Sequence, residues 1–137
     1  MREEGEYERF SEQVKRLILL EVLLLVLRRD RARLEELPLK TRRALIRWLS
    51  RTTEQVRREL VETRMELFRL GGRIVEVRQC RDCREVRARF KGYVYTMRYL
   101  NGWLRSECED FLLRSWAGKN TSGKNPPGEH IMKGREG

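Results

Sequence analysis

With 137 residues, the chain is long enough for one compact domain and too short for two. Hydrophobic residues at 39% suffice for a core, and 31 basic against 21 acidic residues give a net charge of +10 and a pI near 10.1. The longest apolar run, Leu17–Leu27, is about half of a membrane span and is followed by arginines instead of a cleavage site, which excludes a transmembrane helix and argues against secretion. We expect a cytoplasmic protein with an acidic partner and no membrane.

The first predicted element is a helix from about Tyr7 to Leu37, a stretch without glycine or proline. Its apolar run extends around the whole circumference, which is typical of a helix buried on all sides. If the other elements are too few to cover it, the uncovered side becomes a homodimer interface. Pro38 ends this helix.

A second helix is predicted from about Lys40 to Leu70, with Thr41 as its N-cap and Gly71-Gly72 as its left-handed C-cap. Its apolar stripe has spacings of three and four residues and is expected to face the first helix. The members of this stripe are Leu45, Leu49, Thr52, Val56, Leu60, Thr63, Leu67 and Leu70. Three arginines at four-residue spacing lie on a different side, namely Arg43, Arg47 and Arg51.

From Arg73 the period changes to two, which predicts a β-hairpin over about residues 73–99. In its first strand, Val75 and Val77 share one face, opposite Glu76 and Arg78. The second strand begins near Glu85 and alternates an apolar inner face with a basic outer face. The inner residues are Val86, Ala88 and Phe90, and the outer ones are Arg87, Arg89 and Lys91.

After Gly92 the pattern fits both a strand and a helix, and we expect the strand to end near Tyr99. Asn101 then caps a last helix, from about Gly102 to Trp116, which buries Leu104, Cys108, Phe111 and Leu112. The glycine-rich and proline-containing residues 117–137 are expected to be a disordered tail. The sequence thus predicts a mainly α (α+β) fold in a single domain, residues 1–116, built from two long antiparallel helices, a β-hairpin and a C-terminal helix.

This order of elements, with the segments VLRRD (26–30), RIVEV (73–77), KGY (91–93) and YLNGWL (99–104), resembles small uncharacterised proteins encoded by bacilli and their phages. The resemblance extends over about residues 10–115. It implies the helix, helix, hairpin and helix layout and a mobile-element origin, but no activity and no functional residues.

The sequence offers no catalytic constellation, and we expect neither an enzyme nor a cofactor. Cys80 and Cys83 form a lone CxxC, which would need two more ligands for a closed zinc site, and only Cys108 and His130 remain. A solvated turn around Asp82 is the simpler interpretation, and the three thiols are expected to be reduced and free of metal. The only histidine lies in the predicted tail, which argues against a histidine-based triad.

The charge is more informative, because it is −1 for residues 1–36 but +5 for 37–72 and +4 for 73–91. A codon bias toward arginine, 25 against 6 lysines, would have spread the excess evenly. We therefore predict a nucleic-acid-binding surface on the second helix and the hairpin, formed by Arg43, Arg47, Arg51, Arg78, Arg87, Arg89 and Lys91. If the second strand continues past Gly92, Tyr93 and Tyr95 follow on its basic face and could stack on bases; alternatively, both pack in the core.

Two functions are compatible with these patterns. The first is a non-enzymatic basic accessory protein that binds nucleic acid. The second is a protein-interaction or homodimerisation module, in which the arginines only make ion pairs within the chain.

Overall fold

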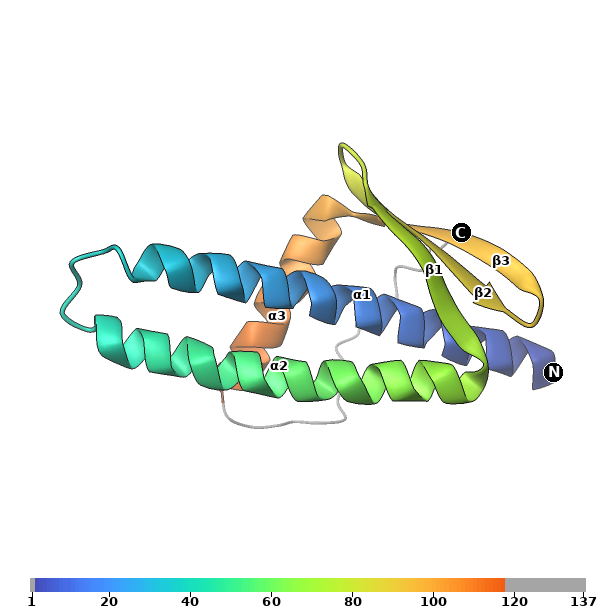
Figure 1. Ribbon diagram of the computed structural model, residues 1–137, viewed down its shortest axis with the longest axis horizontal. Coiled ribbons are helices and arrows are strands. Elements are labelled where there is room, and N and C mark those ends of the chain that lie inside the picture. Colours follow the sequence, from blue (N-terminus) through green and yellow to red (C-terminus); the bar gives the residue numbers. More distant parts are fainter. Residues whose placement is uncertain (1, 118–137) are drawn as a thin grey trace. The chain divides into compact units, whose positions relative to one another are not determined.

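The computed structural model describes residues 2–117, and the side chains of residues 5–117. The chain divides between Leu70 and Gly71 into two compact units. The first is a helical hairpin, and the second is a three-stranded sheet followed by a helix (Figure 1). The fold is therefore mainly α with an antiparallel sheet, as the sequence predicts. The predicted tail, apart from Ala117, lies outside the described residues, and so does His130.

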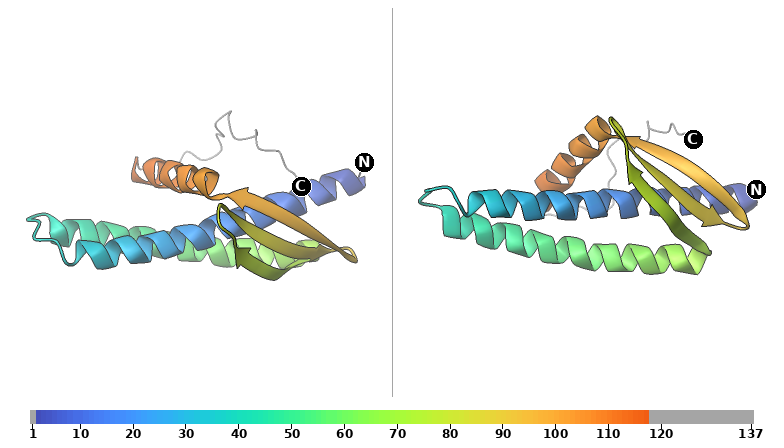
Figure 2. Two further views of the ribbon diagram at one scale, coloured as in Figure 1. Left: turned by 90° about the horizontal axis from the view of Figure 1, so that it is seen from above. Right: turned by 45° about the horizontal axis from the view of Figure 1, so that its top comes forward.

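The helical hairpin consists of α1 (Arg2–Leu34) and α2 (Arg42–Leu70), which run side by side in opposite directions (Figure 1) and keep this pairing in both views of Figure 2. Thr41 lies at the start of α2, where its carbonyl accepts a hydrogen bond from the Leu45 N–H. The Arg42 side chain donates to the carbonyls of Glu35 and Leu37 and so holds the end of the loop against the end of α1.

The core of the helical hairpin follows the predicted pattern. Within the apolar run of α1 only Leu25 is exposed, and the most buried side chains have 3% exposure or less. Five of the eight predicted stripe residues of α2 are buried, namely Thr52, Val56, Leu60, Thr63 and Leu67, whereas Leu45, Leu49 and Leu70 are half-buried. The two buried threonines satisfy their hydroxyls by donating to carbonyls one turn earlier, at Trp48 and Glu59. No helix in the described part of the chain is long and apolar enough to cross a membrane.

The second unit is a meander of β1 (Gly72–Gln79), β2 (Cys83–Phe90) and β3 (Tyr93–Leu100), with α3 (Asn101–Trp116) following at once. Gly71, at φ 92°, supplies the left-handed residue that ends α2, as predicted. The expected hairpin is therefore a three-stranded sheet, because a turn at Lys91 (φ 52°) and Gly92 (φ 85°) reverses the chain.

Three local predictions are wrong. In α3, Leu104 and Cys108 are buried as expected, but Phe111 and Leu112 are only half-buried. A β-bulge between Ile74 and Glu76 takes Val75 out of the alternation, so that Ile74 and Val77 share the inner face and Val75 is 43% exposed. Asn101 is the first residue of α3 and makes no capping hydrogen bond there, since Leu100 occupies the N-cap position. The Asn101 side chain instead donates to the carbonyl of Arg81.

Candidate nucleic-acid interface

One end of the helical hairpin collects positive charge. Residues 28–51, which we call the basic end, comprise the last turns of α1, the loop and the first turns of α2. They contain nine basic and three acidic side chains, a net charge of +6. The rest of the hairpin, residues 2–27 and 52–70, has eight basic and ten acidic side chains, a net charge of −2. The basic end is a continuous stretch of the sequence that spans the boundary between residues 36 and 37, so its charge is divided when residues 1–36 and 37–72 are counted separately.

The three predicted arginines of α2 are at the centre of this basic end. Arg43, Arg47 and Arg51 are exposed and, among the residues that the structure describes, make no ion pair. Four-residue spacing on a helix separates them by about 6 Å each, so the row is roughly 12 Å long. They line an open hollow on the surface of α2 together with Lys40, Ala44 and Trp48.

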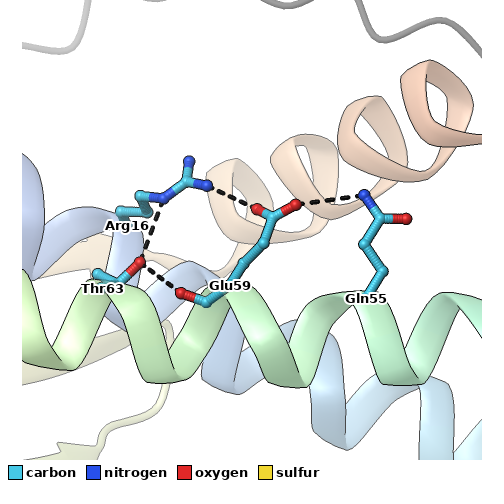
Figure 3. A network of polar contacts seen from close by, with 4 residues as sticks. All are labelled: Arg16, Gln55, Glu59 and Thr63. Atoms are coloured by element: carbon cyan, nitrogen blue, oxygen red, sulfur yellow. Dashed lines mark hydrogen bonds and ion pairs between the residues drawn. The ribbon is translucent and has the colours of Figure 1, made fainter.

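In the other half of α2, most arginines form ion pairs within the chain. Arg57, Arg64 and Arg69 donate to Glu54, Glu21 and Glu66 over 3.0 to 3.1 Å. From α1, Arg16 donates to Glu59 over 2.6 Å and to the Thr63 hydroxyl over 3.3 Å (Figure 3). The carboxylate of Glu59 also accepts from Gln55. Of the four arginines in this half of α2, only the exposed Arg58 makes no ion pair within the described residues. The basic end contains one ion pair, between Arg31 and Glu35 over 3.4 Å, and most of its positive charge is left available.

The outer face of the sheet is the second basic surface. Its register places three cross-strand rows side by side: Arg73, Arg89 and Val94; Glu76, Arg87 and Thr96; and Arg78, Glu85 and Arg98. Five arginines and two glutamates give this outer face a net charge of +3. Arg73 and Arg98 belong to it although the sequence analysis did not select them. Arg98 was missed because of the ambiguity after Gly92, and Arg73 because the bulge between Ile74 and Glu76 changes the face on which it lies.

The row at one end of the outer face is neutralised by a shared carboxylate. Glu85, with a side chain only 12% exposed, accepts from Arg78 over 2.6 Å and from Arg98 over 3.0 Å. The hydrogen bond from Arg78 is the main reason why the pKa of Glu85 is lowered from its usual value of 4.5, and it raises the pKa of Arg78 in turn. In the next row, Arg87 pairs with Glu76 over 2.9 Å.

Arg73 and Arg89 form the row without a carboxylate. Both are exposed, and neither makes an ion pair within the described part of the chain. Of the predicted sheet residues, Arg89 is therefore the one whose charge is least compensated, whereas Arg78 and Arg87 are already paired. Lys91 lies in the turn, with its Nζ 5.7 Å from the centre of the Phe90 ring.

The alternative in which tyrosines extend the basic face is wrong. The turn at Lys91–Gly92 pairs Phe90 with Tyr93 and Ala88 with Tyr95, so both tyrosines lie on the inner face. Within the described residues of the outer face, none is aromatic. Tyr93 is nevertheless 68% exposed, which also differs from the expectation that both rings pack in the core.

The CxxC forms the tip between β1 and β2. The carbonyls of Cys80 and Cys83 accept from the side chain of Gln79, and those of Arg81 and Asp82 accept from Asn101. Asn101 and Gln79, and not the side chain of Asp82, therefore organise the turn. Cys83 is also buried instead of solvated. Among the described residues, no group of three or more histidine, cysteine or acidic side chains could hold a metal ion.

Comparison with known proteins identifies a family whose model covers both units of the chain. No curated protein and no solved structure matches the chain. The family model described as YhjD protein matches residues 6–120, which include the helical hairpin, the sheet and α3. The chain therefore belongs to the YhjD protein family.

Proposed function

We propose that this protein is a non-enzymatic accessory protein that binds nucleic acid through the basic end of its helical hairpin and the outer face of its sheet. One observation carries the proposal: Arg43, Arg47 and Arg51 are exposed without ion pairs in the described structure, whereas three arginines farther along the same helix are paired. A phosphate backbone is the partner that supplies anions in a row.

The contrast within α2 separates this proposal from two simpler explanations. If arginine were abundant only through codon bias, unpaired arginines would be spread evenly along the helix, whereas in the described structure Arg58 is the one arginine of its second half without an ion pair. If arginines served only intramolecular pairing, the basic end would contain more acidic residues. The row of about 12 Å would pass three or four phosphates of one strand, which recur every 3.4 Å along the axis of a duplex.

The test compares two triple variants of the full chain. Replacing Arg43, Arg47 and Arg51 together with glutamine should weaken binding to a DNA oligonucleotide and reduce the slope of log K against log salt by roughly two to three. The control replaces Arg57, Arg64 and Arg69, which removes the same charge from the same helix but takes it from ion pairs. Equal slopes for the two variants would contradict a specific role of the basic end. If the natural chain fails to bind any nucleic acid at about 50 mM salt, the proposal itself is wrong.

A third variant, in which Arg87, Arg89 and Lys91 are replaced with glutamine, tests the outer face of the sheet separately. Because Arg87 is already paired with Glu76, we expect the largest single effect at Arg89. The single replacement Arg87→Gln is the matched control for Arg89→Gln. An unchanged salt dependence for both Arg89→Gln and Arg87→Gln would remove the sheet from the proposed interface, and a larger effect at Arg87 would contradict the expectation for Arg89.

The second candidate function is a protein-interaction or homodimerisation module. The first helix offers little surface for it, because Leu25 alone of its apolar run is exposed. A better candidate surface is on α2, where Val61, Met65 and Phe68 are 53%, 50% and 80% exposed at helical spacing. Gel filtration of the natural chain and of Phe68→Glu would detect such a dimer as a mass that halves in the variant.

The remaining parts of the proposal concern where the protein acts. Its three cysteines are free thiols, which fits a cytoplasmic location. Binding of this kind needs no catalytic group and no cofactor. An origin in bacilli or their phages, which the sequence resemblance implies, belongs to the proposal as well.

A further inference from the structure

We infer that the face of α2 that carries Arg43, Arg47 and Arg51 binds single-stranded nucleic acid, with the indole ring of Trp48 stacked against an unpaired base. This inference rests on the proposed function and specifies the class of nucleic acid. It depends on how Trp48 is placed among the unpaired arginines of the basic end.

Trp48 lies beside the arginine row. It follows Arg47 directly, precedes Arg51 by three residues and follows Ala44 by four, so that all of them line the same open hollow. Trp48 is 39% exposed, which places part of this large aromatic residue at the surface beside guanidinium groups. The small side chain of Ala44, one turn before Trp48, leaves room next to the ring.

This combination fits a single strand better than a duplex. In a single strand the bases can turn outward and present their faces, so that an aromatic ring stacks on a base while arginines contact the flanking phosphates. In a duplex the base faces are occupied by neighbouring base pairs, and a side chain of Trp48 would reach only base edges or the backbone. Phosphate contacts alone would not distinguish the two forms, so the exposed ring is the feature that selects between them.

The sheet does not offer the same combination. Tyr93 and Tyr95 lie on the face opposite the arginine rows, and no described residue of the outer face is aromatic. The sheet can therefore contribute phosphate contacts but not stacking. Arginines and an aromatic ring occur together instead at the first turns of α2.

The experiment measures the affinity of the full chain for a 15-nucleotide oligo(dT) and for a duplex of equal length, with Trp48→Leu, Trp48→Phe and the natural residue. We expect the leucine variant to lose about fivefold or more of its affinity for the single strand, the range of one base–aromatic stack, and less than twofold for the duplex. Phenylalanine should restore most of the loss. The salt dependence should not change, because no phosphate contact is removed.

Phe68→Leu is the matched control, since Phe68 is an aromatic side chain on the same helix, 80% exposed, outside the basic end. A second measurement uses Trp103→Phe/Trp116→Phe, which leaves Trp48 as the only tryptophan, and follows quenching of its fluorescence by oligo(dT). Circular dichroism shows whether each variant folds.

The outcomes separate the inference from the proposed function. Equal affinity for both oligonucleotides, together with an unchanged affinity of Trp48→Leu, would overturn the inference while nucleic-acid binding stands. Leu37 and Leu39, 46% and 44% exposed in the loop of the basic end, could instead insert into a membrane surface. Binding to vesicles of phosphatidylserine and phosphatidylcholine without binding to either oligonucleotide would therefore overturn both.

Discussion

Arg73 and Arg89 lie directly opposite each other on β1 and β2, both exposed on the outer face of the sheet. Like charges at directly opposed positions destabilise an antiparallel pair. We therefore predict that Arg89→Thr increases the free energy of unfolding in urea by about 0.2–1 kcal/mol at low salt. The gain should vanish in 1 M salt, where the screening length is about 3 Å. Arg87→Thr, which removes the partner of Glu76, is the control and should not stabilise the protein.

Glu85 should make stability depend on pH in the acidic range. Its carboxylate is held by Arg78 and Arg98, so folding lowers its pKa from 4.5. A lowered pKa means that the stabilisation is present above pH 4.5 and is lost as the pH falls through the pKa of the folded protein. We predict that Glu85→Gln is less stable than the natural chain in urea unfolding at pH 7, and that the two converge in acid. Glu54→Gln, at a carboxylate that is 61% exposed, should have a smaller effect on stability. If the natural chain and Glu85→Gln differ in stability as much at pH 3 as at pH 7, the prediction is wrong.

The turn between β2 and β3 requires glycine at one position. A Cβ added at Gly92 or at Gly102 would meet no atom within 4 Å, but only Gly92 has a positive φ, 85°. We predict that Gly92→Ala lowers the free energy of unfolding by about 1 kcal/mol through backbone strain. Gly102→Ala, in α3, should be neutral or stabilise by up to about 1 kcal/mol. Thermal unfolding of the two variants measures the difference, and equal losses of stability would contradict the prediction that the positive φ of Gly92 is the cause.

The three thiols should differ in reactivity. Cys80 is half-buried, whereas burial raises the pKa of Cys83 above its usual value and that of Cys108 to about 11. Because the thiolate is the reactive species, we predict that a disulfide reagent at pH 8 modifies Cys80 first and the other two only when the protein unfolds. Peptide mapping by mass spectrometry after timed labelling measures this order. Labelling of Cys108 as fast as Cys80 in the native protein would contradict it.

The sequence predicted the helical hairpin well because its signals are long and local. The buried stripe on α2 runs over more than four turns, from Thr52 to Leu67, and Gly71 ends the helix where a left-handed residue is needed. Its boundaries shifted by only a few residues. The three arginines of α2 were found for the same reason, since four-residue spacing on a helix fixes a common side without any knowledge of the tertiary structure.

The sheet was predicted less accurately, because a turn of two residues changes which side chains share a face. If β2 had continued through Gly92, Arg89 and Tyr93 would lie on one side; the reversal at Lys91 places them on opposite sides. Positive φ at a lysine is not encoded by any strong local pattern. The bulge at Val75 has the same effect on β1. Partners distant in sequence, such as Asn101 for the tip at Arg81, were also invisible before the fold was known.

The separation of charge along the helical hairpin also gives this unit an electric dipole. With 33 residues, α1 is about 50 Å long, several times the screening length of about 8 Å at physiological salt. The acidic side chains of the far half therefore cannot weaken the field at the loop. A diffusing polyanion would exert a torque on the hairpin and turn the loop toward itself before any contact forms. Orientation before collision would appear as an association rate constant that falls steeply with salt while the dissociation rate changes less.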